Sequence, residues 1–271
     1  HGSCGMGFGS TIERHENSPT KLFAQDLQFP EIVAIKLRAI RQYYQEKALK
    51  QGFTEFAELP HEQEDSRFIN YTLDLQSLKE KGVLLWVNEQ EVFSEHTTFE
   101  HFIFEGAQGI LLDMDFGFFP NVTRSNTSSK NALQLIKRNN LIFEKIDLWY
   151  VSRAYHTRHG AGWFPLEQHP LVLINTEKET NQLNDYQGFF RKAPLHIDLV
   201  RYALEIDNSF SKDFSKNIII TCTDQIPDNQ LFVFKEQKLQ HTKLEHLPNL
   251  LEHHFSKVLF SKNDYSEGLL D

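Results

Sequence analysis

The residues from Phe104 to Ser128 form the densest set of groups that could bind a ligand. Gln108 offers both a donor and an acceptor, and it lies between Gly106 and Gly109, which let a ligand approach the backbone closely. Hydroxyl and amide side chains then gather at Thr123, Ser125, Asn126, Thr127 and Ser128. Such a cluster can hold phosphate oxygens without a fixed positive charge. The segment therefore predicts a phosphate-binding loop; the alternative is a strand followed by a hydrophilic turn and a helix cap.

A second candidate is the glycine-rich stretch over residues 1–18, where Gly5, Gly7 and Gly9 alternate. Glycines at this spacing allow tight curvature and close approach to a ligand. The stretch is not a Walker phosphate loop, because no Gly-Lys-Ser/Thr follows it. It predicts a ligand-binding loop or a flexible turn. Because the chain opens on His1 inside this stretch, we expect the sequence to be a fragment of a longer protein.

The histidines and cysteines do not predict a metal site. His156, His159 and His169 have no zinc-motif spacing, and no acidic or cysteine ligand accompanies them. Cys4 and Cys222 are too far apart in sequence to indicate a disulfide framework or a zinc motif. Two such cysteines are typical of a reducing, cytoplasmic protein.

Periodicity predicts the elements that must position these residues. Helical spacing of apolar residues predicts helices over 30–52, 62–81, 131–139, 197–206 and 244–254. Apolar runs rich in β-branched residues predict strands over 83–87, 99–104, 146–155, 171–174, 217–221, 231–234 and 257–260. Strands interleaved with helices predict an α/β fold with a central, mostly parallel sheet flanked by helices. We expect one domain over residues 1–271, with a mobile polar loop over 175–187.

The bulk composition narrows the classes of partner. The chain has 271 residues, of which 40% are hydrophobic, and a net charge of −9. This length can bury a sizeable core. An acidic chain with no long basic run is a poor candidate for binding nucleic acid or anionic membranes. No apolar run approaches the length of about 18 residues that a membrane helix needs.

The first candidate loop also resembles a known family signature. The run FEGAQGILLDMDFGFFPNVTRSNTSS is similar to the EGAQG-x-LLD-x-D-x-G-x-x-P-x-VT-x-SN signature of adenylosuccinate synthetases. The resemblance implies that Gln108 contacts IMP and that Thr123 binds the IMP phosphate. GSCGMGFGST resembles the Gly-Thr-Thr-Gly loop of the family, which implies IMP contacts at Ser3 and Cys4, with Arg14 a weak candidate for a further phosphate contact.

Two later segments resemble the loops that hold aspartate and the IMP ribose. VSRAYHTRHGAGWFPLE resembles the T-R-V-G-x-G-P-F-P-T-E loop, which implies that Thr157, Arg158, His159 and Gly160 line the IMP ribose and aspartate region. QGFFRKAPLHIDLVRYAL resembles the aspartate loop Thr-Thr-Gly-Arg-x-Arg-Arg. Arg191 keeps its place there and is expected to contact both IMP and aspartate. Gln187 and Tyr186 replace the paired threonines, and Phe189 replaces the first arginine, whose bidentate fork phenylalanine cannot offer.

The guanine site is implied by TCTD, which resembles the Thr-Lys-x-Asp motif. Asp224 would accept the guanine N1 and N2 hydrogens, and Cys222 stands where the family has lysine. The resemblance implies a cytoplasmic, homodimeric ligase that joins L-aspartate to IMP with GTP as co-substrate and Mg²⁺ as cofactor. The family's phosphate loop, catalytic base and histidine have no counterpart in these residues. We therefore expect residues 1–271 by themselves to show no turnover. The alternatives are a diverged, non-catalytic nucleotide-binding paralogue and a relative that uses an altered purine or ATP.

Overall fold

The computed structural model describes residues 5–94, 99, 101–251 and 254–262, and Ser3 and Cys4 lie outside them. Contacts divide the chain into two compact units. Unit 1 comprises residues 1–6 and 101–271, and unit 2 comprises residues 7–100. The two units are described separately, and the single-domain boundaries of 1–271 stay a prediction.

Unit 2 is helical. Its helices are α1 (Phe8–Asn17), α2 (Pro30–Lys50), α3 (His61–Glu80) and α4 (Glu89–Ser94). The predicted helices over 30–52 and 62–81 are confirmed: Pro30 takes the first turn of α2, where its missing N–H is not needed, and Gly52 follows its end with a positive φ of 85°. Residues 8–17 form a helix, so the prediction of a loop or turn throughout 1–18 is wrong there. Residues 83–87 form no strand, because no strand among the described residues pairs with their backbone.

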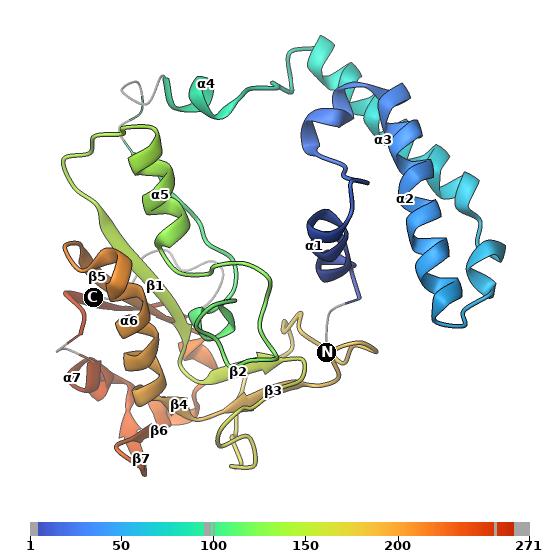
Figure 1. Ribbon diagram of the computed structural model, residues 1–271. Coiled ribbons are helices and arrows are strands. Elements are labelled where there is room, and N and C mark those ends of the chain that lie inside the picture. The colour runs from blue at the N-terminus through green and yellow to red at the C-terminus, as the bar shows by residue number, and fades with distance from the viewer. Residues whose placement is uncertain (1–4, 95–98, 100, 252–253, 263–271) are drawn as a thin grey trace. The chain divides into compact units, whose positions relative to one another are not determined.

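Unit 1 is built on a three-stranded parallel sheet in the order β1-β5-β8. The strands are β1 (Asp147–Arg153), β5 (Ser215–Thr221) and β8 (Lys257–Phe260). The helices are α5 (Lys130–Arg138), α6 (Ile197–Ser211) and α7 (Leu247–Leu251) (Figure 1). This confirms the predicted α/β fold with its parallel sheet flanked by helices. Among the described residues, no helix is both long and apolar enough to cross a membrane.

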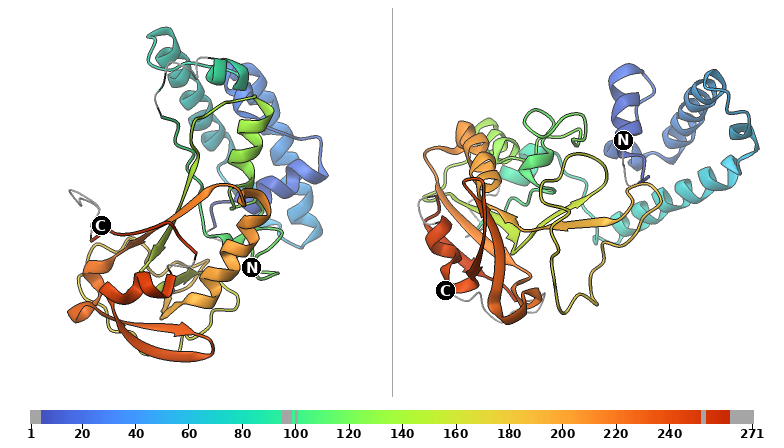
Figure 2. Two further views of the ribbon diagram at one scale, coloured as in Figure 1. Left: turned by 90° about the vertical axis from the view of Figure 1, so that its left-hand side faces the viewer. Right: turned by 90° about the horizontal axis from the view of Figure 1, so that it is seen from below.

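Two smaller sheets complete unit 1. β2 (His156–His159) and β3 (Phe190–Ala193) form an antiparallel pair. β6 (Gln230–Lys235) pairs in parallel with β4 (Leu195–His196) and antiparallel with β7 (Lys238–Lys243), a long hairpin visible in Figure 2. The strands predicted at 99–104 and 171–174 are wrong. The described residues of these runs are irregular, and Ile174 makes one backbone bond, to the carbonyl of Gln225. An apolar run without a partner strand cannot form a ladder.

The core of unit 1 lies between the strands and helices α6 and α7. Its fully buried members include Tyr155, Leu195, Ile220 and Leu247. His196 precedes α6 and caps it, because its Nδ1 accepts the backbone N–H of Leu199 at 3.4 Å. Burial of these apolar side chains fixes the directions of β1 and β5, and therefore the loops at their ends.

Candidate functional site

The motif loop, residues 104–129, is organised around the buried carboxylate of Asp113. This carboxylate accepts the backbone N–H groups of Asp115 at 2.9 Å and Thr127 at 2.6 Å, and the side-chain amide of Asn126 at 3.3 Å. Burial alone would raise the pKa of Asp113, but these hydrogen bonds outweigh burial and hold the pKa below its ordinary value. A single carboxylate thus joins the middle of the loop to its C-terminal end.

Thr123 and Gln108 lie on opposite arms of the same loop. The N–H of Thr123 donates to the carbonyl of Leu112 at 2.8 Å, which holds half-buried Thr123 beside the Asp113 arm. The hydroxyl of Thr127 donates to the carbonyl of Gly109 at 3.1 Å, next to Gln108. Gln108 is exposed and has a left-handed φ of 70°. The structure therefore brings the two arms together, while a shared pocket for the Gln108 and Thr123 side chains stays a prediction.

A second buried carboxylate, Asp207 on α6, anchors the end of the motif loop. It accepts the N–H of Ser129 at 2.7 Å, the hydroxyl of Tyr150 at 2.5 Å and the hydroxyl of Ser211 at 2.8 Å. Burial and then the Asp207 carboxylate raise the pKa of Tyr150. Asp207 was not among the residues predicted from the sequence. The signal that could have identified it is an acidic residue directly after the apolar positions of the helix predicted over 197–206.

The β2–β3 pair brings together the residues that the resemblance assigns to aspartate and the IMP ribose. Thr157 pairs with Lys192, and His159 pairs with Phe190, along this ladder. The ring Nε2 of His159 lies 3.1 Å from the carbonyl of Gly188. The loop before β3 is held by Asn184, whose side-chain oxygen accepts the N–H of Gln187 at 3.1 Å.

Arg191 on β3 binds the turn that follows β2. Its Nη1 pairs with Glu167 at 2.8 Å, and its Nη2 donates to the carbonyls of Gly160 at 2.5 Å and Gly162 at 3.1 Å. Thr157, His159, Gly160 and Arg191 therefore lie on one hairpin. Phe189, which the resemblance places at the family's first arginine, is 74% exposed.

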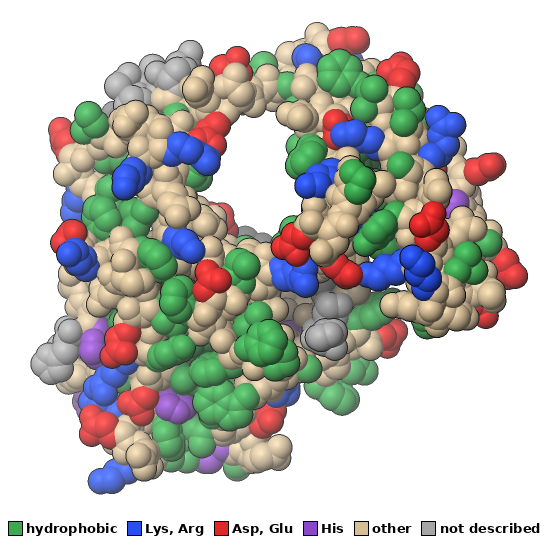
Figure 3. Space-filling view, viewed as in Figure 1, with side chains coloured by type: hydrophobic (Ala, Val, Ile, Leu, Met, Phe, Trp, Pro, Cys, Tyr) green, Lys and Arg blue, Asp and Glu red, His purple; other side chains and the backbone are tan. Residues whose placement is uncertain are grey.

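Arg158 differs from its neighbours because its guanidinium is buried. Nε donates to the carbonyl of Ala161 at 3.0 Å, and Nη2 donates to the carbonyls of Ala161 and Asn121, both at 2.8 Å. The last bond reaches the motif loop two residues before Thr123. Phe118 of the motif loop also makes an edge-on contact with Trp163, with ring centroids 4.8 Å apart. Figure 3 shows hydrophobic side chains gathered over β2 and β3 on the viewed face of unit 1.

The residues assigned to guanine lie at the carboxyl end of β5. Cys222 has a left-handed φ of 57°, and the N–H and hydroxyl of Thr223 donate to the carbonyl of Ser261 just beyond β8. The backbone carbonyl of Asp224 accepts the side-chain amide of Asn175 at 2.9 Å. No hydrogen bond to the Asp224 carboxylate occurs within the described part of the chain.

The sheet edge, meaning Arg153, Glu179 and residues 221–225, carries an ion pair that sequence reasoning missed. Nη1 of Arg153 at the end of β1 lies 2.5 Å from Oε2 of Glu179 and 3.0 Å from the hydroxyl of Tyr155. Burial opposes ionisation, but the hydrogen bond to Arg153 lowers the pKa of Glu179 to about 2. Burial also raises the pKa of the nearby Cys222 thiol. The segment predicted as a mobile loop over 175–187 is thus fixed to the sheet at Glu179.

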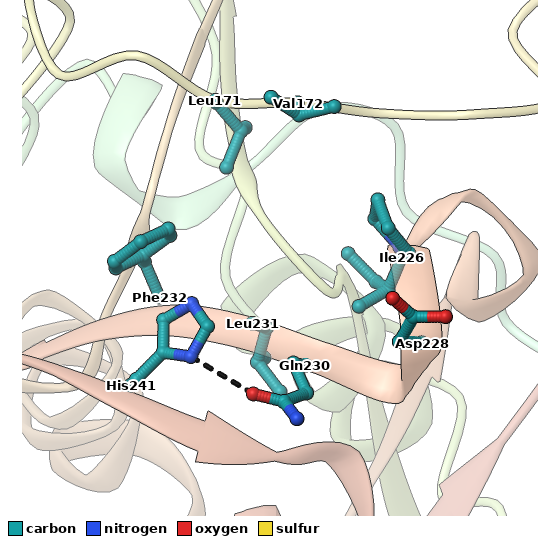
Figure 4. Close-up of a pocket in the computed structure, with 9 residues that line it drawn as sticks. Leu171, Val172, Ile226, Asp228, Gln230, Leu231, Phe232 and His241 are labelled. Carbon is teal, nitrogen blue, oxygen red and sulfur yellow. Dashed lines mark hydrogen bonds between the residues drawn. The ribbon is translucent and has the colours of Figure 1, made fainter.

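A separate hollow of about 300 Å³ lies beside the β6–β7 hairpin. It is lined mainly by apolar side chains, with His241 hydrogen-bonded to Gln230 at 3.0 Å on one side and Asp228 on another (Figure 4). None of the predicted site residues lines it. The described residues contain no cluster of three or more His, Cys, Asp or Glu side chains that could hold a metal ion.

The parallel β1-β5-β8 sheet with its flanking helices defines an α/β protein, and residues 221–225 lie at the carboxyl end of its central strand, the usual place for ligands in such sheets. Residues 1–229 match the family model described as adenylosuccinate synthetase. The chain belongs to the adenylosuccinate synthetase family.

Individual proteins agree with this assignment. The chain is 29% identical over 198 residues to an adenylosuccinate synthetase of Paracoccidioides lutzii, covering 72% of this chain and 43% of that protein. It is 36% identical over 107 residues to one of Thermoplasma volcanium, covering 39% of this chain and 24% of that protein. The matched residues thus span less than half of these relatives. A solved structure, that of fully ligated adenylosuccinate synthetase from Plasmodium falciparum, shares the fold with a TM-score of 0.66 at 15% identity, over 97% of this chain and 68% of that one.

Proposed function

We propose that this chain serves the GTP-dependent ligation of L-aspartate to IMP, which yields adenylosuccinate for AMP biosynthesis. The observation that supports the proposal best is the meeting of the motif loop with the β2–β3 hairpin. The bond from Arg158 to Asn121 and the contact between Phe118 and Trp163 join segments that the resemblance assigns to one nucleotide. A chance match to either motif would not require the two to touch.

In this proposal the motif loop binds IMP and the hairpin holds aspartate beside it. Thr123 donates its hydroxyl to the IMP phosphate, together with Ser3 and Cys4, and Gln108 contacts the IMP base. Arg191 and Gly160 face the ribose, while Thr157, His159 and Gln187 face the amino acid. Charge-assisted bonds from Arg191 would suit both a ribose hydroxyl and a carboxylate.

Guanine recognition is assigned to the end of β5. The free carboxylate of Asp224 would accept the two N–H groups of guanine, which adenine does not present. Cys222 adds neither a charge nor a strong donor there. We therefore propose a preference for GTP over ATP that rests on Asp224 alone.

The chemistry of the proposed reaction is phosphoryl transfer followed by displacement. The γ-phosphoryl group of GTP moves to O6 of IMP, and the aspartate amine then displaces phosphate. These residues would contribute by binding and orienting IMP and aspartate, which supplies much of the acceleration in such reactions. The part of the chain that the structure describes holds no cluster of three or more His, Cys, Asp or Glu side chains, so no step is assigned to magnesium here. We further propose that the protein is a cytoplasmic homodimer.

The alternative of a diverged, non-catalytic nucleotide-binding paralogue is favoured by one observation. Phe189 stands exposed where the family's first aspartate-binding arginine would be, and its ring cannot bind a carboxylate. In that case the chain would bind IMP but not aspartate.

Calorimetric titration of the chain with IMP, inosine and AMP tests the proposal. We expect IMP to bind more tightly than inosine, because only IMP carries the phosphate that Thr123 would hold. A further titration with aspartate, in the presence of IMP, separates the ligase from the paralogue. Absence of IMP binding, or equal affinity for IMP and inosine, would contradict the proposed function.

A further inference from the structure

We infer that Arg158 is a positioning residue that fastens the motif loop to the turn over residues 160–162 and thereby holds Thr123 in place for the IMP phosphate. The inference rests on the proposed function for the identity of the ligand. It departs from the resemblance, which implies that Arg158 lines the ligand itself.

The hydrogen bonds of Arg158 show where its guanidinium is directed. All three join it to backbone carbonyls, two to Ala161 and one to Asn121. The side chain is only 8% exposed. Asn121 lies two residues from Thr123, and the N–H of Thr123 is itself bound to the carbonyl of Leu112. A displacement of Asn121 would therefore be passed directly to Thr123.

Backbone carbonyls, and no carboxylate among the described residues, stabilise the charge of Arg158. Within the described ranges, Arg191 pairs with Glu167, whereas no ion pair involves Arg158. Burial, and then the positive charge of Arg191, lowers the pKa of Arg158. A buried cation without an ion-pair partner is costly, so its compensation must come from the three carbonyl bonds. Only the planar fork of arginine offers Nε and Nη2 to two carbonyls at once.

The backbone at this junction leaves no space for rearrangement. Gly162 has a φ of 114°, and a Cβ added to it would lie 2.4 Å from Nη2 of Arg158 and 2.6 Å from Cβ of Asn121. The turn and the motif loop thus approach each other as closely as glycine permits. The edge-on contact between Phe118 and Trp163 holds the same two segments at a second point.

The test compares Arg158→Lys with wild type and with Arg201→Lys. Arg201 on α6 provides a matched control, because it bonds His254 and Asp198 rather than the motif loop. We expect Arg158→Lys to weaken IMP binding about tenfold, the cost of losing a charge-assisted hydrogen bond. Inosine affinity should not change, since inosine has no phosphate. The control should change neither affinity.

Hydrogen exchange of the unliganded proteins gives a second readout. The amides of Asn121 and Thr123 are hydrogen-bonded, and in Arg158→Lys they should exchange about tenfold faster than in the control. Gly162→Ala retains the guanidinium but forces the segments apart, so it should give the same pattern. This variant also serves if Arg158→Lys folds poorly.

The possible results separate the inference from the proposed function. Equal weakening of IMP and inosine, or unchanged exchange at Asn121 and Thr123 in both variants, would overturn the positioning role. If wild type binds no IMP, the proposed function fails, and faster exchange at these two amides still supports the fastening of the loop by Arg158.

Discussion

The motif loop is held by two buried carboxylates, Asp113 in the loop and Asp207 on α6, whereas the sheet edge is held by one partly buried carboxylate, Glu179. Asp113 and Asp207 accept the backbone N–H groups of Thr127 and Ser129, while Glu179 accepts the guanidinium of Arg153 together with the N–H and side-chain amide of nearby Asn181. A carboxylate bound to the backbone of a distant segment determines the path of the chain there, while an ion pair joins two side chains. The motif loop is therefore fixed through its own backbone at Thr127 and Ser129, whereas β1 is joined to Glu179 through the side chain of Arg153.

The largest effect is expected at Asp207, which closes the motif loop. Asp207→Ala leaves the N–H of Ser129 and the hydroxyl of Tyr150 without an acceptor, while the hydroxyl of Ser211 keeps its bond to the backbone carbonyl of residue 207. We expect the free energy of unfolding to fall by about 3–5 kcal/mol. Urea denaturation of wild type and variant measures this loss in the free energy of unfolding. Tyr150→Phe, which removes one donor and strands no other group, should cost about 1 kcal/mol. Equal losses in the two variants would show that the bond from Ser129 to Asp207 adds no stability beyond the bond from Tyr150.

Thr123→Val probes the ligand side of the same loop. The change keeps the shape of the side chain and removes the hydroxyl, so IMP should bind more weakly by about 1–3 kcal/mol. Isothermal titration measures this loss. Thr242→Val on β7, outside the predicted site, is the control and should leave IMP affinity unchanged. Equal affinities of wild type and Thr123→Val would contradict the phosphate role.

Glu179→Gln tests the sheet edge through its pH dependence. The pKa of Glu179 is about 2 in the folded protein, below its ordinary value of 4.5. Between these values the unfolded state binds more protons, so the stability contributed by Glu179 is present above about pH 4.5 and is lost as pH falls toward 2. We expect Glu179→Gln to cost about 1–2 kcal/mol at pH 7. The difference from wild type should shrink in acid. Denaturation curves of both proteins between pH 7 and pH 2 measure this difference in the free energy of unfolding. A difference that stays constant with pH would contradict the ion pair.

The smallest effect is expected at Cys222. Cys222→Lys should strengthen GTP binding by about 0.5–1 kcal/mol, the size of a partly exposed charge interaction. ATP affinity should change less, because Asp224 favours guanine. Competition binding with both nucleotides measures the change, with Cys222→Ser as the uncharged control. Strict selectivity of the wild type for GTP would show that another residue already supplies what lysine gives.

The sequence predicted the parts of the fold whose signals are local. β5 and β8 were found from short β-branched runs, and α2 from its apolar spacing between Pro30 and Gly52. Residues 83–87 have a similar apolar character but no strand beside them, and pairing depends on residues elsewhere in the chain. Apolar character alone therefore could not distinguish them from true strands.

In the candidate site, too, only features with a local sequence signal could be predicted. The motif loop identified Gln108 and Thr123 by type and order. The groups that hold the loop in place could not be found this way, because Asp207 is 78 residues from Ser129 and Glu179 is 26 residues from Arg153. Arg158 was recognised by its motif, yet its direction toward backbone carbonyls depends on a loop 37 residues away.

The separation of 78 residues in sequence between Ser129 and Asp207 also determines the order in which contacts can form during synthesis. The motif loop cannot reach its final form on the ribosome until α6 has been translated, and β8 joins the sheet later still, pairing with β5 about 40 residues after it. Parallel strands with such long separations close slowly. Under the proposed function, capture of IMP by the nascent chain would therefore follow completion of α6, because only then can the bond between Ser129 and Asp207 form.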